Sequence, residues 1–172
     1  MFKSAVSRFK SAVSGAVRIA TSAGVQGTLS ISLVYPDRVV HVLKKDNLVV
    51  LGGKMRLLQA LYLGDAASPI STLRVGNGGT IDPEGQFPKR VNQSLTRLFN
   101  EVQSIPVTYS LDVTHPSITY IADIDPELCN SVLLSEAGLF FGNGEMFNIK
   151  TFPGIPKTLD FSIHFEWVIK IN

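Results

Sequence analysis

The clearest pattern of apolar and polar positions lies at residues 160–171. Large apolar side chains alternate there with polar ones, and only Val168 interrupts the alternation. Successive side chains of a β-strand point to opposite faces, so this pattern predicts a strand with one buried face. We expect the buried face to carry Phe161, Ile163, Phe165, Trp167, Ile169 and Ile171. The opposite face should carry Asp160, Ser162, His164, Glu166 and Lys170.

Two further apolar segments precede this strand and predict a β-hairpin. Residues 134–141 and 145–152 are rich in apolar and aromatic side chains, and a glycine-bearing turn at residues 142–144 separates them. Glu136 is the one charged residue of the first segment. A carboxylate in a buried strand usually accepts hydrogen bonds from backbone or hydroxyl groups, and we expect this of Glu136. A role in binding a ligand is the alternative.

The middle of the chain predicts more strands, two helices and a loop. Apolar spacing predicts one helix from Leu48 to Leu63, with Asn47 as its N-cap, and a second helix at residues 92–102. A stretch rich in proline and glycine predicts a surface loop at residues 80–89. Alternation predicts further strands at residues 28–35, 39–43, 70–75, 106–112 and 117–124.

Together these elements predict a mainly β protein, an antiparallel β-sandwich with two short helical insertions. The glycine-rich segment at residues 76–79 predicts a turn with positive φ rather than a phosphate-binding loop. No helix start with Lys and Ser or Thr follows this segment, and Asp82 and Glu84 would repel a phosphate.

The first 24 residues have a pattern of their own. The hexapeptide Phe-Lys-Ser-Ala-Val-Ser at residues 2–7 recurs at residues 9–14, which places apolar residues at alternating four- and three-residue spacing. This spacing predicts an amphipathic helical arm at residues 1–24, followed by a β-sandwich domain at residues 25–172. Gly24 and Gly27 are expected to act as the C-cap and a hinge.

Three interpretations of the arm remain open. It can pack on its own domain or on a neighbouring subunit. It can lie on a membrane surface, although its apolar side is reduced to alanine after Val13. It can contact nucleic acid or an acidic protein, because four basic residues and no acidic residue fall in this segment: Lys3, Arg8, Lys10 and Arg18.

Composition narrows the class of protein. The 172 residues include 45% hydrophobic and 17% charged residues, which fits a globular domain with an appendage. The mean hydropathy of +0.21 is high for a soluble monomer and predicts surface buried against other subunits. A net charge of +2 does not by itself indicate a nucleic-acid partner. No apolar run approaches the roughly 20 residues that span a bilayer, and no apolar core of a secretory signal is present at the N-terminus.

The chemistry-bearing residues are scattered. The single Cys129 excludes an intramolecular disulfide and is expected to be a reduced, buried thiol. His41, His115 and His164 have no cysteine or carboxylate at metal-ligand spacing, and no nucleophile elbow is present. The sequence therefore predicts no catalytic residues, no cofactor and no metal site.

The C-terminal region resembles a known group of proteins. Its order of motifs is Ser135-Glu136-Ala137-Gly138-Leu139-Phe140, a glycine hairpin, Lys157-Thr158 and a final strand with Trp167-Val168-Ile169. This order, together with an apolar helix and a Val-Gly-Asn-Gly-Gly turn upstream, is similar to small tailed-bacteriophage virion proteins over about residues 47–172. The residues that match as structural motifs are Glu136, Gly138, Lys157 and Trp167.

This resemblance implies a structural component of the virion, in the neck or collar or in the tail fibre and baseplate region. We expect a homo-oligomer that docks through its sheets and arms, assembled in the host cytoplasm. Expected partners are copies of the chain and other phage neck or tail proteins, without a membrane partner and with nucleic acid disfavoured. The arm residues expected to make these contacts are Phe2, Val6, Arg8, Phe9, Lys10 and Val13.

The alternative function is a carbohydrate-binding module of a tail fibre or receptor-binding complex. Such a module exposes aromatic side chains to stack on sugar rings. Nearly all aromatic residues of this chain fall on strand positions that are expected to point inward, and the main exceptions are Tyr62 and Phe87. The aromatic pattern therefore favours the structural role.

Overall fold

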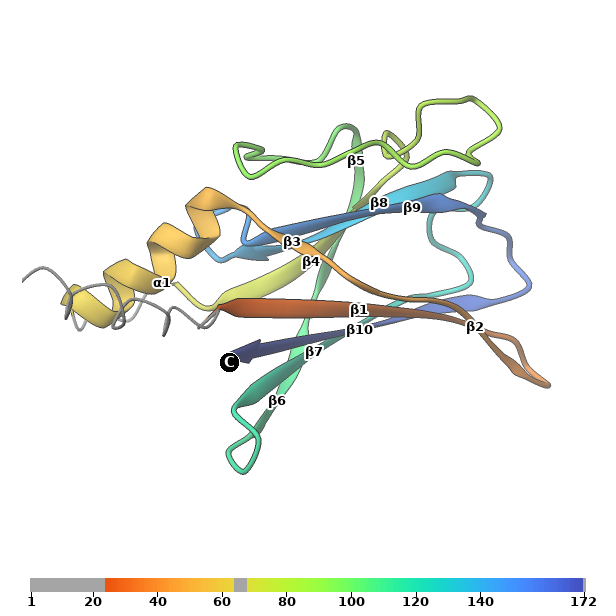
Figure 1. The fold of residues 1–172 in the computed structure, drawn as a ribbon. Helices are drawn as coiled ribbons and strands as arrows, with labels where there is room; N and C mark the ends of the chain where they lie inside the picture. The colour runs from red at the N-terminus through yellow and green to blue at the C-terminus, as the bar shows by residue number, and fades with distance from the viewer. Residues whose placement is uncertain (1–23, 64–67, 172) are drawn as a thin grey trace, which may run out of the picture.

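The computed structural model describes residues 24–63 and 68–171, so the predicted N-terminal arm falls almost entirely outside the described residues. The described chain is mainly β and forms two antiparallel five-stranded sheets that pack against each other (Figure 1). In the first sheet the strand order is β2 (Val39–Asp46), β1 (Val25–Val34), β10 (Ser162–Ile171), β7 (Ser117–Ile124) and β6 (Thr108–Asp112). In the second sheet it is β3 (Leu48–Val49), β9 (Asn148–Pro156), β8 (Leu133–Phe141), β4 (Ile70–Gly76) and β5 (Glu101–Pro106).

Strand β10 lies in the middle of the first sheet, between β1 and β7. The face predicted to be buried is buried from Phe161 to Ile169, and it packs against the second sheet in one hydrophobic core. The prediction was wrong for Ile171, whose side chain is 68% exposed. Ile171 is the last residue of β10 and borders an opening between the sheets, so the second sheet does not cover it.

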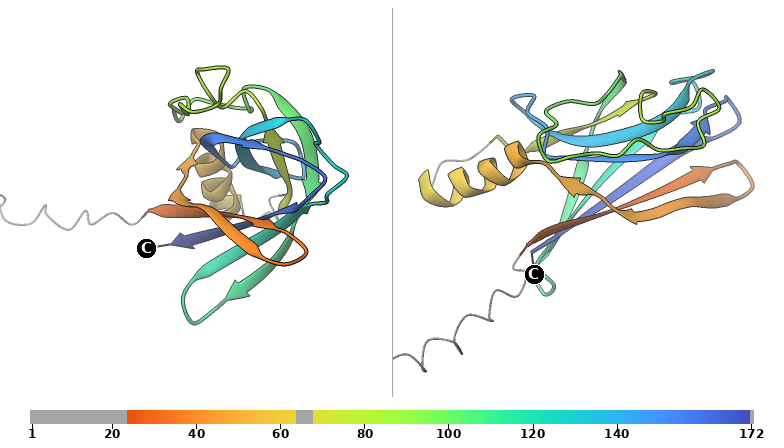
Figure 2. Two further views of the ribbon diagram at one scale, coloured as in Figure 1. Left: turned by 90° about the vertical axis from the view of Figure 1, so that its right-hand side faces the viewer. Right: turned by 45° about the horizontal axis from the view of Figure 1, so that its top comes forward.

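The described chain passes between the sheets at four places, and at two of them one strand continues through a single residue into the next. Strand β2 continues through Asn47 into β3, and β5 continues through Val107 into β6. The corners keep backbone hydrogen bonds, because the Asn47 N–H donates to the Gly27 carbonyl at 2.9 Å and the Val107 N–H donates to the Ser71 carbonyl at 3.1 Å. Strands that switch sheets form the corners of a sandwich. Seen end-on in the left view of Figure 2, the strands therefore surround a common interior.

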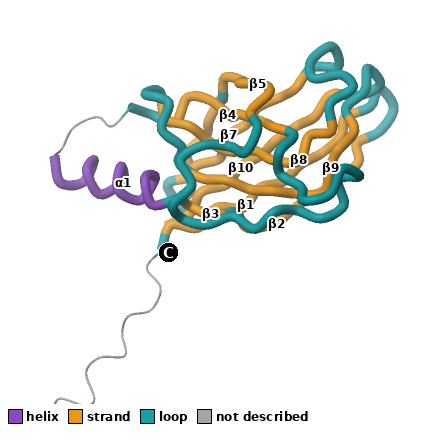
Figure 3. Tube along the Cα trace, turned by 90° about the horizontal axis from the view of Figure 1, so that it is seen from above, coloured by secondary structure: helices purple, strands orange, loops and turns teal. Residues whose placement is uncertain are grey.

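The one helix of the described residues is α1 (Leu51–Leu63), which projects past the end of the sheets (Figure 3). The predicted start at Leu48 was wrong, because Leu48 and Val49 pair with β9 as strand β3. Asn47 is not the N-cap, since its side chain lies between the sheets and accepts a hydrogen bond from the Trp167 indole N–H at 2.9 Å.

The second predicted helix, at residues 92–102, is not formed; turns and the start of β5 occupy this segment. Its apolar residue Leu98 is buried in a small second cluster of hydrophobic side chains, so the apolar spacing reflects burial in an irregular segment. The backbone N–H groups of Phe99 and Asn100 donate to the Glu136 carboxylate instead of to helical carbonyls. The predicted surface loop at residues 80–89 is confirmed.

Candidate functional site

Glu136 lies in the middle of β8 and is completely buried. Its Oε1 accepts hydrogen bonds from the backbone N–H groups of Gly78, at 3.1 Å, and Asn100, at 2.7 Å. Its Oε2 accepts one from the Phe99 N–H at 2.8 Å. The prediction of a buried carboxylate that accepts backbone hydrogen bonds is therefore confirmed. With both oxygens engaged, Glu136 joins two loops to the sheet.

The glycines at residues 76–79 allow the two loops to approach each other closely, because they have no side chain. Among the described glycines, only Gly85 and Gly144 have positive φ, so the predicted positive-φ turn at residues 76–79 was wrong. A Cβ on Gly76 would overlap the Asn100 carbonyl, and one on Gly78 would lie 2.7 Å from the Asn100 nitrogen. The segment thus needs glycine because another backbone passes against it.

Lys157 is buried at the other end of the sandwich, where its ammonium group donates to the carbonyl oxygens of Pro126 at 2.9 Å and Thr158 at 2.7 Å. Burial lowers the pKa of Lys157. Cys129 nearby is free and half-buried rather than fully buried, and burial raises the pKa of its thiol. Lys157 therefore fixes the loop before β8 to the approach of β10.

The remaining two motif residues, Trp167 and Gly138, also make contacts that hold the sandwich together. Trp167 is buried in the core and its indole N–H reaches Asn47 at the β2–β3 corner. Gly138 lies where a Cβ would come within 2.7 Å of the Asn148 carbonyl oxygen, so β8 and β9 approach closely at this point. Gly27, predicted to be a hinge, lies inside β1 beneath the Asn47 side chain. All four motif residues thus hold structural contacts.

The three histidines lie in separate places and have separate partners. His41 Nδ1 lies 2.8 Å from Ser32 Oγ, and His164 Nδ1 lies 2.7 Å from an oxygen of Asp123. His115 contacts the carboxylate of Asp112 on the β6–β7 hairpin. In residues 24–63 and 68–171, no three His, Cys, Asp or Glu side chains gather as a possible metal site. The same residues contain no helix with the length and apolar character of a membrane span.

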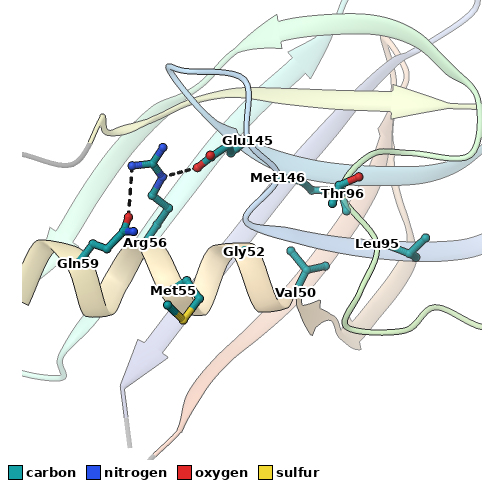
Figure 4. Close-up of a pocket in the computed structure, with 9 residues that line it drawn as sticks. All are labelled: Val50, Gly52, Met55, Arg56, Gln59, Leu95, Thr96, Glu145 and Met146. Atoms are coloured by element: carbon teal, nitrogen blue, oxygen red, sulfur yellow. Dashed lines mark hydrogen bonds and ion pairs between the residues drawn. The ribbon is translucent and has the colours of Figure 1, made fainter.

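A shallow pocket of about 270 Å³ lies between α1 and the turn that joins β8 to β9 (Figure 4). Arg56 of α1 forms an ion pair with Glu145 across this pocket and also donates to the Gln59 side chain at 3.3 Å. The hydrogen bond from Arg56 lowers the pKa of Glu145. Arg56 lies on α1 and Glu145 lies in the turn between β8 and β9, so this ion pair connects α1 to the second sheet.

A second and more apolar opening lies at the end of the sandwich, between α1 and the β6–β7 hairpin. We call it the apolar mouth; its volume is about 370 Å³. Three of its lining side chains are strongly exposed, with exposed fractions of 61% for Leu111, 80% for Val113 and 68% for Ile171. Other lining residues come from four elements and include Val25, Leu57, Ile70 and Tyr120.

Sequence reasoning missed the apolar mouth. Alternation assigns Leu111 to the inner face of its strand together with Tyr109, yet both are exposed because β6 is the edge strand of its sheet. How far an edge strand extends beyond the opposite sheet depends on the twist of both sheets, and a local pattern does not record it. The signal that was available was the high mean hydropathy.

The residues predicted to make partner contacts, from Phe2 to Val13, lie outside the described residues. Comparison with known proteins finds no family model, no curated protein and no solved structure that matches this chain. The described surfaces, and above all α1 and the apolar mouth, therefore carry the functional argument.

Proposed function

We propose that this chain is a structural subunit of a tailed-bacteriophage virion, in the neck, collar or tail apparatus, and that it assembles as a homo-oligomer. The phage assignment is supported by the order of motifs in residues 135–140, 157–158 and 167–169. The assembly assignment is supported by the apolar surface of α1. The subunits assemble because the apolar faces of one subunit are covered by the next subunit.

The observation that carries the assembly argument is the outer side of α1. Leu51, Met55 and Leu58 follow the spacing of one helix face and are 55%, 48% and 58% exposed. The opposite side packs on the domain, with Gly53 against Phe147. A helix that is apolar on both sides is typical of a helix buried on both sides. A second protein surface is therefore expected on this stripe.

The exposed aromatic residues do not favour the carbohydrate-binding alternative. The two most exposed of the aromatic side chains that the structure describes are Phe87, at 63% exposed in the loop above the second sheet, and Tyr109, at 70% exposed on β6, an edge strand of the first sheet. These two segments are on opposite sides of the sandwich in Figure 1. A sugar platform requires aromatic rings on one surface, and these two rings do not share one.

The test has two measurements. Light scattering on the purified full-length chain should give a mass that is a multiple of the 18.7 kDa of one chain. Mass spectrometry of particles purified from infected host cells should find the chain in a fixed ratio to the other tail proteins. A monomeric mass at all concentrations contradicts the homo-oligomer, and a chain made during infection but missing from purified particles contradicts the virion role.

A further inference from the structure

We propose that the apolar mouth receives the N-terminal segment of a neighbouring copy of this chain, with Phe2, Val6, Phe9 and Val13 as the inserted side chains. This inference rests on the proposed homo-oligomer and names the surface that the arm binds.

Within residues 24–63 and 68–171, no segment covers the apolar mouth. Its exposed apolar side chains come from two different segments, Leu111 and Val113 from the β6–β7 hairpin and Ile171 from the end of β10. Soluble proteins rarely leave several large apolar side chains together in water unless another surface binds there. Because most of the lining side chains are aliphatic or aromatic, the ligand that they favour is itself largely apolar.

The N-terminal segment has the matching chemistry and the right starting point. Val25, the second described residue, lies on the rim of the mouth, so residues 1–23 are joined to the domain at this place. Those residues carry apolar side chains at heptad-like spacing and basic side chains between them. The one acidic group of the lining is Asp112. Hydrogen bonds from the backbone N–H groups of His115 and Thr114 lower the pKa of Asp112, and the His115 ring contacts its other oxygen, so the lining carries a negative charge that favours the approach of Arg8 or Lys10.

The direction of β1 favours a neighbouring copy over the same chain. Val25 pairs with Ile171 at the mouth, and β1 runs from there into the body of the sandwich. β1 therefore enters the sandwich at the mouth. The helix predicted from the sequence for residues 1–24 would cover about 18 Å from Val13 to Val25, at about 1.5 Å per residue, and would carry Phe2 to Val13 beyond the mouth of their own chain. A neighbouring mouth that faces this one is reached without a reversal, and each copy can give and receive the same segment.

Cysteine cross-linking on the full-length chain tests this contact. Cys129→Ser removes the native thiol, and Phe9→Cys is placed on a chain with one tag while Val113→Cys is placed on a co-expressed chain with another tag. The matched control replaces Val113→Cys by Ile81→Cys, since Ile81 is 73% exposed but lies in the loop of residues 80–89. Under mild oxidation we expect a disulfide between differently tagged chains for the Val113 variant and little for the Ile81 variant.

Three results overturn the inference. The first is no cross-link at Val113, and the second is equal cross-linking at Val113 and Ile81. The third comes from one chain that carries both Phe9→Cys and Val113→Cys: a disulfide formed only within that chain means that its own segment covers the mouth. The mass separates the two proposals, because an oligomeric mass without the cross-link overturns the arm contact alone, whereas a monomeric mass contradicts the homo-oligomer itself.

A substitution adds an independent measurement. Val113→Asp puts a charge into the mouth at a side chain that is 80% exposed, so the fold of the subunit should be unchanged. We expect it to raise the dissociation constant of the oligomer about tenfold or more, whereas Ile81→Asp should leave that constant nearly unchanged. An unchanged dissociation constant for Val113→Asp overturns the inference.

Discussion

One carboxylate organises the centre of the second sheet. Glu136 and its neighbour Ser135 both face the segment at residues 76–79: the Gly78 N–H donates to Glu136 and the Gly79 N–H donates to the Ser135 hydroxyl at 2.9 Å. Glu136 also holds the backbone at Phe99 and Asn100. The Ser-Glu pair thus replaces the missing helix and sheet hydrogen bonds of two irregular segments. These hydrogen bonds give a physical reason for the Ser-Glu pair in the motif of residues 135–140.

Replacing Glu136 should be among the most destabilising single changes in the described residues. In Glu136→Gln the side-chain NH₂ group would face a backbone N–H, leaving a buried donor without an acceptor. Because hydrogen bonds to a charged group contribute about 1.5–3 kcal/mol each, we expect the free energy of unfolding to fall by roughly 2–4 kcal/mol. Urea denaturation followed by tryptophan fluorescence measures this change.

The matched control is Glu84→Gln, which removes the same charge from an exposed loop. It should change the free energy of unfolding by less than about 0.5 kcal/mol. Equal effects of the two substitutions would show that Glu136 acts through net charge rather than through its three backbone donors.

At the scale of elements, α1 shows how one helix meets two constraints. Its consecutive glycines are chemically equivalent in sequence but not in space. A Cβ on Gly52 would have the Met146 carbonyl oxygen as its nearest neighbour, at 3.9 Å, whereas a Cβ on Gly53 would overlap the Phe147 carbonyl. Only Gly53 is needed for helix α1 to approach the second sheet.

Alanine substitution at the two glycines should therefore change the free energy of unfolding in opposite directions. Alanine is favoured over glycine in a helix by about 1 kcal/mol, so Gly52→Ala should raise the free energy of unfolding by roughly 0.5–1 kcal/mol. Gly53→Ala should lower it by about 1–3 kcal/mol, because the new methyl group forces α1 away from Phe147. Thermal and urea denaturation of both variants check the signs. Stabilisation by both substitutions would contradict the close contact at Gly53.

The sequence predicted the features that depend on local patterns and missed those that depend on contacts between residues far apart in the chain. The strands with clean alternation, above all residues 160–169, depend on burial of one face and were predicted. The helix expected at residues 92–102 was wrong because its backbone donors bind Glu136, 36 and 37 residues away in the chain. The burial of Glu136 was predicted from its apolar neighbours, but its partners and the apolar mouth depend on contacts that no local pattern contains.

At the scale of the whole molecule, two of the apolar surfaces lie at the same end. The outer stripe of α1 and the apolar mouth both lie at the end where α1 projects past the sheets (Figure 3). The two surfaces belong to different elements, so a partner that covers both would hold the helix and the first sheet in a fixed relation. The ion pair between Arg56 and Glu145 fixes the helix from its other side.

Charge on the outer stripe of α1 should prevent assembly without unfolding the subunit. Leu58 is 58% exposed, so Leu58→Glu should leave the free energy of unfolding of the monomer within about 0.5 kcal/mol of the original value. The oligomer should dissociate, because burying an unpaired carboxylate is costly. Light scattering over a concentration series gives the mass, with Ile81→Glu as the exposed control. An oligomer as stable as the original would exclude this stripe from the interface.

The pairing of β1 with β10 also orders events in time. The first sheet has β1 near its centre, and the neighbour that completes it is the last strand of the sequence, while Trp167 meets Asn47 across 120 residues. Contacts between distant parts of a chain slow folding, because a large loop has to close before they form. During synthesis β1 must wait for β10, so the first sheet is completed only after residues 162–171 have been made. A subunit that offers a finished apolar mouth is then one whose translation has passed Ile171.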